Sequence, residues 1–201
     1  MEVGTQGRGR RTAVIAGLLL AAGAGSRFGG GKLLHEVEGA AIGVRSARNL
    51  LAAGLTVTAV VRPGSDELSR LLTAAGCIVT ECPNAADGMG VSLAHAVAHA
   101  RAASGWVVAS ADMPRIAQET VRAVVDAVAQ GALIAAPVYH GKRGHPVGFS
   151  GRLRDELLAL EGDEGARAVL RRHHADIRLL EVDDAGVLFD IDRKEDVPSR
   201  L

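Results

Sequence analysis

The residues most suited to chemistry begin in a glycine-rich stretch, GLLLAAGAGSRFGGGKLL, at positions 17–34. Five glycines lie between positions 23 and 31, and they allow backbone N–H groups to turn toward a ligand without Cβ clashes. Arg27 and Lys32 add two positive charges to the same loop. Inward N–H groups and cations together suit a polyphosphate. A flexible loop with two solvated cations is the alternative, and the glycines alone are equally compatible with it.

Three other interpretations of this stretch fail. A dinucleotide fingerprint needs a third glycine where Phe28 stands, and a P-loop needs a Ser or Thr where Leu33 stands. Two arginines and an apolar run over 13–22 have the form of a secretion signal. However, cleavage would remove the first predicted strand, and the run is shorter than the roughly 20 apolar residues of a membrane span. We therefore expect a cytoplasmic protein whose residues 1–11 form a flexible N-terminal arm.

Carboxylates elsewhere in the chain are candidates for a metal site. Asp112 follows the apolar segment 105–109, and an Asp just past a buried strand can bind Mg²⁺ through an oxygen atom. Pro114 and the distance to the next predicted helix argue against a capping role. Near the C-terminus, Asp190 and Asp192 stand one residue apart, so on a strand both would face one side. We expect a second ligand for the same Mg²⁺ from this pair.

Three further loops carry polar groups suited to binding. Asn84 and Ser92, in the segment PNAADGMGVSLAHAV, can bond a base or ribose, or act as turn and cap residues. The segment HGKRGHPVGF at 140–149 follows a predicted strand and indicates a clamp on an anionic second substrate, with a mobile hairpin tip as the alternative. The segment GDEGAR at 162–167 starts a predicted helix whose N–H groups favour anions, and Arg167 adds a charge.

Neither of two possible zinc patterns is complete. His95 and His99 have the i, i+4 spacing of metal ligands, but no third ligand is near in the sequence. Cys77 and Cys82 lack a second pair of ligands. We predict that the histidines are partly exposed helix residues and that the cysteines are small, partly buried residues in a reducing compartment.

Composition narrows the class of protein. The chain is 48% hydrophobic and 23% charged, and its 201 residues suffice for one domain with a core. Its 23 basic residues balance 23 acidic ones, so nothing draws it to nucleic acid or to a membrane. Only three of the basic residues are lysines, which favours a need for a compact ammonium group at Lys32.

The elements that must position these residues alternate along the chain. Predicted strands lie at 13–20, 55–61, 77–80, 105–109, 132–138, 177–182 and 187–191. Predicted helices lie at 41–53, 65–75, 91–103, 117–130, 151–160 and 165–173. Gly54, Gly76, Gly105 and Gly131 stand just before strands, as helix C-cap glycines do. This order favours an α/β fold of three layers, α/β/α, with a mainly parallel central sheet, in which ligands bind at the carboxyl ends of the strands.

Six motifs in this order resemble the MobA-like NTP transferases, and most closely the molybdenum cofactor cytidylyltransferases. They are LLAAGAGSRFGGGK at 19–32, NAADGMGVSL at 84–93, ADMP at 111–114, KRGHPVGF at 142–149, GDEGAR at 162–167 and DIDRKED at 190–196. The resemblance covers residues 15–197 and implies one Rossmann-like nucleotidyltransferase domain over 12–201. Arg193 and Lys194 stand where the family usually has Thr and Pro, which puts the shape of that loop in question.

The resemblance implies an Mg²⁺-dependent transfer of CMP from CTP to the terminal phosphate of molybdenum-bound molybdopterin, with release of pyrophosphate. The implied nucleotide-binding residues are Leu20, Ala21, Ala22, Gly23, Ala24, Gly25, Ser26, Arg27, Lys32, Asn84 and Ser92. Arg27, Lys32 and Asp112 would be catalytic, and Asp112 and Asp192 would bind Mg²⁺. The acceptor would contact Lys142, Arg143, His145 and Arg167. A molybdenum hydroxylase apoenzyme is the expected protein partner.

The sequence Ala21-Ala22-Gly23 is similar to the cytidylyl type, because the guanylyl type usually has Gly at the second position, where a Cβ would crowd the larger purine. Three alternatives stay open. One is the same reaction type with GTP or with another acceptor, such as a sugar phosphate or phospholactate. The second is an NAD(P)H-dependent oxidoreductase acting on a small aromatic compound. The third is a non-catalytic factor that delivers the molybdenum cofactor.

Overall fold

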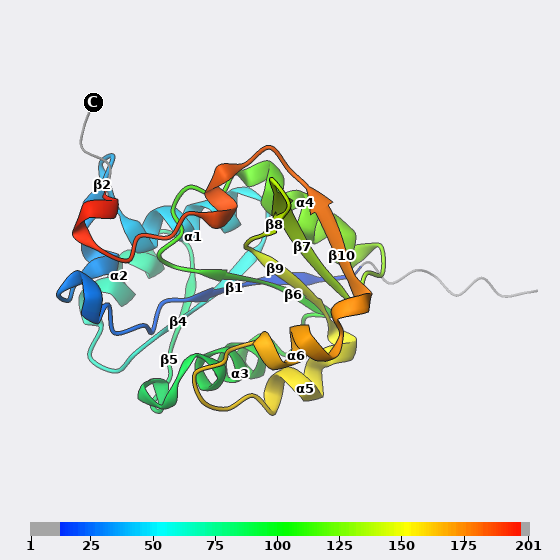
Figure 1. Cartoon of the computed structure of the whole chain (residues 1–201). Helices are drawn as coiled ribbons and strands as arrows, with labels where there is room; N and C mark the ends of the chain where they lie inside the picture. The colour runs from blue at the N-terminus through cyan, green and yellow to red at the C-terminus, as the bar shows by residue number, and fades with distance from the viewer. Residues whose placement is uncertain (1–12, 198–201) are drawn as a thin grey trace, which may run out of the picture.

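A central sheet of eight strands organises the protein, which a computed structural model describes over residues 13–197 (Figure 1). The predicted arm at 1–11 lies outside the described residues. Six strands match predicted ones: β1 (Ile15–Leu20), β4 (Thr56–Val61), β5 (Ile78–Glu81), β6 (Gly105–Ser110), β7 (Ile134–Tyr139) and β10 (Ile177–Glu181). The strand order is β10-β7-β9-β6-β1-β4-β5, with β8 (Lys142–Arg143) attached to β7. All pairs are parallel except those of β8 and of β9 (Val147–Ser150).

Helices cover both faces of the sheet, which confirms the predicted three-layer α/β fold (Figure 1). One face is packed by α1 (Ile42–Ala52), α2 (Asp66–Ala74) and α4 (Gln118–Ala129). The other is packed by α3 (Met89–His99), α5 (Arg154–Leu158) and α6 (Arg167–Arg172). Because side chains of a strand alternate between faces, Leu19 and Ala21 join the first core and Leu18 and Ala22 join the second.

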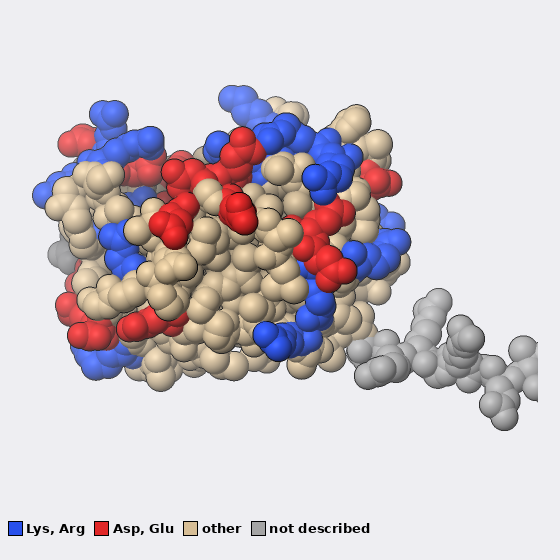
Figure 2. Space-filling view, turned by 90° about the horizontal axis from the view of Figure 1, so that it is seen from below, with Lys and Arg blue, Asp and Glu red and all other residues tan. Residues whose placement is uncertain are grey.

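The helix α3 is held to the sheet by apolar packing. Its residues, MGVSLAHAVAH, include no Lys, Arg, Asp or Glu, and Leu93, Ala96 and Val97 are buried against the sheet. Figure 2, which looks at the face where α3, α5 and α6 lie, shows a broad uncharged surface with charged groups gathered around it. The first turn of α3 borders the site described below, and the apolar packing of the residues that follow it holds the helix on the sheet.

Three of the predicted C-cap glycines are confirmed, and one is wrong. Gly54, Gly76 and Gly131 follow α1, α2 and α4 and have positive φ angles of 86°, 103° and 101°. Gly105 is instead the first residue of β6. A Cβ there would lie 2.9 Å from Ile15, from Val128 and from the Phe149 carbonyl oxygen, so close packing is what requires glycine.

Other corrections concern the C-terminal half. The predicted strand at 187–191 is wrong, because Ala185–Leu188 form a 3-10 helix and the chain continues without regular structure. The segment 140–149, predicted as a loop, forms β8 and most of β9, and β9 runs between β6 and β7. The predicted helix at 151–160 is a 3-10 turn, Gly151–Leu153, followed by the short α5. Among residues 13–197, no helix is both long enough and apolar enough to cross a bilayer.

Candidate functional site

An open cavity of about 280 Å³ lies where β1 and β6 end, at the expected edge of the sheet. Its wall comes from the glycine loop, from the start of α3 and from the residues that follow β6. The lining residues are Leu20, Ala22, Gly23, Ala24, Gly25, Lys32, Leu33, Arg62, Ala85, Ala86, Gly88, Met89, Ser92, Ser110, Asp112 and Asp163. Eight of these were predicted from the sequence: Leu20, Ala22, Gly23, Ala24, Gly25, Lys32, Ser92 and Asp112.

The glycine loop turns Lys32 toward the cavity. Two short 3-10 helices, Ser26–Phe28 and Lys32–Leu34, interrupt the loop. Gly25 has a φ of +59°, and a Cβ on it would lie 3.2 Å from the Cβ of Lys32, so glycine is needed there for both conformation and space. Phe28 is buried with Ile42 and Ile191, which anchors the loop between its two cationic residues.

The C-terminal segment brings Asp192 to the same place. Ile191 is fully buried against Phe28, and its N–H donates to the Asp112 carbonyl oxygen at 3.0 Å. The Asp196 carboxylate accepts from the N–H groups of Asp192 and Arg193 at 2.9 and 2.7 Å, which fixes the turn after Asp192. The Arg193-Lys194 pair therefore sits in a turn that the Asp196 side chain holds.

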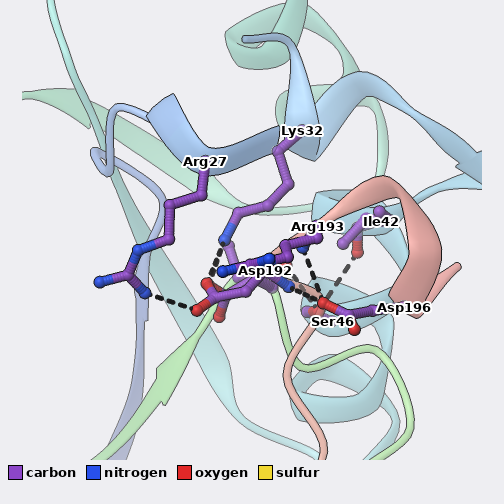
Figure 3. Close-up of polar contacts among 9 residues, drawn as sticks. Arg27, Lys32, Ile42, Ser46, Asp192, Arg193 and Asp196 are labelled. Atoms are coloured by element: carbon purple, nitrogen blue, oxygen red, sulfur yellow. Dashed lines mark hydrogen bonds and ion pairs between the residues drawn. The ribbon is translucent and has the colours of Figure 1, made fainter. Parts of the chain in front are cut away.

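Four charged side chains converge at this point (Figure 3). The Lys32 Nζ donates to Asp112 Oδ2 at 2.7 Å and lies 3.4 Å from Asp192 Oδ1. The Arg27 Nη1 donates to Asp192 Oδ2 at 2.8 Å. Burial by itself raises the pKa of Asp192, but the hydrogen bond from Arg27 and the charge of Lys32 outweigh it and hold this pKa below its ordinary value. The Asp192 carboxylate is therefore ionised at neutral pH in this arrangement.

The carboxylate pair suits Mg²⁺. Carboxylate oxygens are hard ligands, and Mg²⁺ is usually held by one or two carboxylates together with substrate phosphates. Both aspartates contact one ammonium group, so their oxygens face a common point. No group of three His, Cys, Asp or Glu side chains arranged for a metal ion occurs within residues 13–197, so the remaining ligands would have to come from a substrate or water.

None of the residues predicted to bind the acceptor, Lys142, Arg143, His145 and Arg167, lines this cavity, but the charges of Asp112, Arg143 and Arg167 all act on His145. The His145 side chain is exposed to solvent, although protein atoms surround much of it. This crowding lowers the pKa of His145, which also responds to Asp112, Arg143, Asp190 and Arg167. These charged groups therefore lie close enough to act together. Arg167 is the first residue of the six-residue helix α6.

Several predicted contacts with the nucleotide are not part of the cavity wall. Ala21 packs on the opposite face of the sheet, in the core under α1. Ser26 and Arg27 are exposed residues of the loop, and Arg27 reaches Asp192 instead. Asn84 begins a 3-10 turn and borders a separate depression beside α3. Of the aspartates in FDID, Asp192 contacts the cations, whereas Asp190 is exposed.

Two charged wall residues were missed by the sequence analysis. The Arg62 Nε donates to the Ala22 carbonyl oxygen at 3.2 Å, from a position directly after β4. A charged residue after a predicted strand was the available signal. Asp163 reaches the cavity because its loop is docked on α3, where the Gly90 N–H donates to the Gly162 carbonyl oxygen at 2.7 Å. This docking depends on a long-range contact, and no local sequence signal predicts it.

The remaining polar candidates make ordinary structural contacts. His95 Nε2 lies 3.0 Å from Thr80 Oγ1, and His99 Nδ1 lies 2.8 Å from the His95 carbonyl oxygen. Cys77 and Cys82 are free and buried, and burial raises the pKa of Cys77 to about 11. The Cys77 thiol is therefore protonated and unreactive at neutral pH.

Comparison with known proteins found a matching family model and two similar proteins. The family model described as "MobA-like NTP transferase domain" matches residues 17–177, which include the glycine loop and Asp112 but end before Asp192. The purine catabolism protein PucB of Bacillus subtilis (strain 168) is 28% identical over 197 residues, covering 92% of this chain and 95% of PucB. Nicotine blue oxidoreductase of Paenarthrobacter nicotinovorans is 27% identical over 191 residues, covering 90% of this chain and 93% of that protein.

Among solved structures, the crystal structure of Rv0371c from Mycobacterium tuberculosis H37Rv is similar to this chain with a TM-score of 0.80 and 26% identity, covering 92% of this chain and 95% of that one. A second crystal structure of Rv0371c is a complex with manganese and has a TM-score of 0.75. The similarity therefore extends over nearly the whole of both chains.

Proposed function

Because the chain belongs to the MobA-like NTP transferase family, we propose that it transfers CMP from CTP to the terminal phosphate of molybdenum-bound molybdopterin and releases pyrophosphate. The observation that carries the proposal is the convergence of Lys32, Asp112 and Asp192 beside a cavity that the glycine loop lines. Phosphoryl-type transfer is catalysed by positioning, by a metal ion and by cations where negative charge gathers. The site offers groups suited to each of these roles.

In the proposed reaction, an oxygen of the acceptor phosphate forms a bond to the α-phosphorus of CTP. The bond from the α-phosphorus to the oxygen that bridges it to the β-phosphorus breaks, and pyrophosphate leaves with that electron pair. The acceptor needs no general base, because a phosphate monoester with a second pKa of about 6 is already an anion at neutral pH. Mg²⁺ bound by Asp112 and Asp192 would neutralise charge on the triphosphate.

The residues of the chain divide between two substrates in this proposal. Leu20, the segment from Ala22 to Gly25 and Ser92 line the cavity and would contact the nucleotide, whereas Ala21, Ser26 and Asn84 lie outside its wall. Arg27 and Lys32 stabilise the triphosphate, and the acceptor's phosphate is bound by Lys142, Arg143, His145 and Arg167. CTP is favoured over GTP because Ala22 lines the cavity, where its Cβ narrows the space for a purine.

The proposal includes the setting of the reaction. A cytoplasmic location is in keeping with the free thiols of Cys77 and Cys82. The product would pass to a molybdenum hydroxylase apoenzyme. The manganese complex of the similar Rv0371c is consistent with a divalent cation at this kind of site, and we propose Mg²⁺ as the ion used here.

The test is pyrophosphate release from each of the four NTPs, with Mg²⁺ and molybdenum-bound molybdopterin as the acceptor. We expect release with CTP and its loss in Asp112→Ala. Release with GTP only would overturn the choice of nucleotide. Release that requires a sugar phosphate or phospholactate would keep the reaction type and replace the acceptor. Tight binding of the cofactor with no release from any NTP would replace the enzyme with a delivery factor.

A second candidate, NAD(P)H-dependent reduction of a small aromatic compound, is raised by the similarity to nicotine blue oxidoreductase. Phe28 argues against binding of a dinucleotide in the usual way. Phe28 stands where a dinucleotide fingerprint needs its third glycine, and it is buried beneath the loop. NAD(P)H oxidation with a dye-like aromatic substrate, in the absence of any NTP, would establish this candidate in place of the transferase.

A further inference from the structure

The ammonium group of Lys32 contacts both Asp112 and Asp192, the two candidate metal ligands. This group lies 2.7 Å from Asp112 Oδ2 and 3.4 Å from Asp192 Oδ1. The side chain of Lys32 is only 11% exposed, and those of Asp112 and Asp192 are 19% and 38% exposed. The Lys32–Asp112 contact is therefore largely shielded from water, where an ion pair is screened less than on the open surface, whereas Asp192 stays partly exposed.

A divalent cation cannot share this point with the ammonium group. Mg²⁺ lies 2.0–2.1 Å from the oxygens that bind it, so an ion held by both carboxylates would stand almost where the Lys32 nitrogen stands. Two cations at such a distance repel each other, and repulsion is strong where water is largely excluded. The ammonium must leave before the ion binds, and it needs another anion to go to.

We propose that Lys32 is an internal counterion that keeps the Asp112–Asp192 pair closed to divalent cations until the triphosphate of a nucleotide draws its ammonium group away. The inference rests on the proposed function, since it takes these aspartates as the metal ligands and an NTP as the substrate. Metal and nucleotide then bind cooperatively, and the coupling is reciprocal: each raises the affinity of the other by the same factor.

The surroundings of Lys32 suit this exchange. Its long, flexible stem carries a compact charge that can move between carboxylate and phosphate oxygens. Its backbone follows Gly31, with a φ of +64°, and its Cβ packs close to Gly25. Arg27 also contacts Asp192, at 2.8 Å, but within residues 13–197 it makes no ion pair with Asp112, and its side chain is 72% exposed. Lys32 is therefore the residue whose removal opens the pair.

The experiment measures Mn²⁺ binding to the nucleotide-free protein by the EPR signal of free Mn²⁺, with Mn²⁺ standing in for Mg²⁺. We expect the affinity of Lys32→Gln for Mn²⁺ to be at least tenfold higher than that of the wild type. Lys194→Gln makes the same change of charge at an exposed position and should match the wild type. Adding Asp112→Asn to Lys32→Gln should remove the gain, which places it at this site. Equal Mn²⁺ affinity in the wild type and Lys32→Gln overturns the proposal.

A second arm adds a non-hydrolysable CTP analogue, after correction for Mn²⁺ bound by the analogue alone. Wild-type protein should bind Mn²⁺ much more tightly with the analogue than without it, and Lys32→Gln should lose most of this coupling. Wild-type protein that binds Mn²⁺ equally well without the analogue contradicts the inference. If Lys32→Gln fails to fold by circular dichroism, Lys32→Met keeps the aliphatic stem and removes the charge.

Failure of this inference and failure of the proposed function are distinguishable. Pyrophosphate release from CTP by a wild type whose Mn²⁺ affinity is the same as that of Lys32→Gln refutes only the inference. Tighter Mn²⁺ binding by Lys32→Gln, with no pyrophosphate released from any NTP, refutes only the transferase reaction.

Discussion

The cations proposed to bind the nucleotide and those proposed to bind the acceptor differ in their ion pairs. We call these two groups of residues the nucleotide side and the acceptor side. On the nucleotide side, Arg27 and Lys32 are both paired with carboxylates, at 2.8 Å from Asp192 and 2.7 Å from Asp112. On the acceptor side, Lys142, Arg143 and Arg167 have no ion pair with any residue in 13–197. The two cations of the glycine loop are neutralised by carboxylates, whereas the acceptor-side cations, like Arg62 in the cavity wall, have no carboxylate partner within residues 13–197.

The difference matches what each side would receive under the proposed function. The nucleotide arrives with a divalent ion, so carboxylates that first hold Lys32 and Arg27 can then hold the metal. The acceptor's phosphate arrives without an ion of its own, so uncompensated cations are what it needs. Long-range attraction of both anionic substrates would come mainly from the acceptor side, where the charge is not cancelled.

The strongest way to break the comparison is to remove a carboxylate from the nucleotide side. Asp112→Asn should lower the rate of pyrophosphate release by about 10³-fold or more, because metal ligation accounts for several kcal/mol of transition-state stabilisation. Pre-steady-state or steady-state assay of pyrophosphate measures it. Asp183→Asn, at an exposed position outside the site, is the matched control and should keep wild-type activity. A rate within tenfold of the wild type would remove Asp112 from the catalytic group.

Removing cations from the acceptor side should have a smaller effect on a different parameter. Arg143→Ala and Arg167→Ala should each raise the KM for the acceptor by about tenfold or more, since a hydrogen bond to a charged group contributes about 1.5–3 kcal/mol. The KM for CTP should stay within about twofold of the wild type, if the two sides bind separate substrates. Steady-state kinetics with each substrate varied in turn decides this. A parallel rise in both KM values would show that the two sides are one site.

A still smaller effect is expected from Ala22→Gly, which tests the source of the preference for CTP over GTP. Ala22→Gly should lower the CTP:GTP ratio of kcat/KM by about tenfold, because a single carbon in a pocket is worth about 1–3 kcal/mol. Ala21→Gly deletes the same atom from a side chain that packs on the opposite face of the sheet. It should lower the melting temperature and leave the nucleotide ratio unchanged. An unaltered ratio in Ala22→Gly would exclude the Cβ of this residue as the source of selectivity.

The parallel part of the fold was predictable from the sequence because its signals are local. Buried apolar segments such as β1 and β6, with glycines that end helices, indicate alternating strands and helices and hence a mainly parallel sheet. The strand β9 was not predictable, because VGFS is short and contains glycine. It forms because β6 and β7 supply hydrogen-bonding partners on both sides and α4 packs on Gly148. That is tertiary context overriding local preference.

The sequence predicted which types of residue form the site, but it did not predict which of these residues contact one another. The apolar pattern at 187–191 correctly indicates burial, since Val187 and Ile191 are fully buried, but it wrongly indicates a strand. Asp192 is positioned by its neighbour Ile191, which packs against Phe28 and whose N–H donates to the Asp112 carbonyl oxygen. Lys32 and Asp112 are 80 positions apart, and Lys32 and Asp192 are 160 apart. No local pattern reports contacts at such separations.

The smallest predicted effect concerns His145 and the pH. Crowding by protein atoms lowers its pKa from 6.5, Asp112 opposes this, and Arg143 reinforces it. The unfolded chain therefore binds more protons than the folded one once the pH falls below about 6.5, so the free energy of unfolding decreases as the pH falls from there toward the lowered pKa. His145→Gln should flatten this slope. Because the side chain is exposed, we expect the change in melting temperature between pH 7.5 and 5.5 to shrink by only about 2 °C.

The causes of the lowered pKa of His145 can be tested separately from those that act on Asp192. Burial is the main cause of the lowered pKa of His145, and the charge of Arg143 adds to it, so Arg143→Ala should raise this pKa, and so should an anion bound between the two side chains. NMR titration of the His145 ring, with and without inorganic phosphate, measures both shifts. On the nucleotide side, Asp192 has a lowered pKa, so its share of stability is lost only as the pH falls below about 3.8, far from this range. A His145 pKa that changes with neither Arg143→Ala nor phosphate would mean that Arg143 does not act on His145, and the contrast between the two sides would then rest on ion pairing alone.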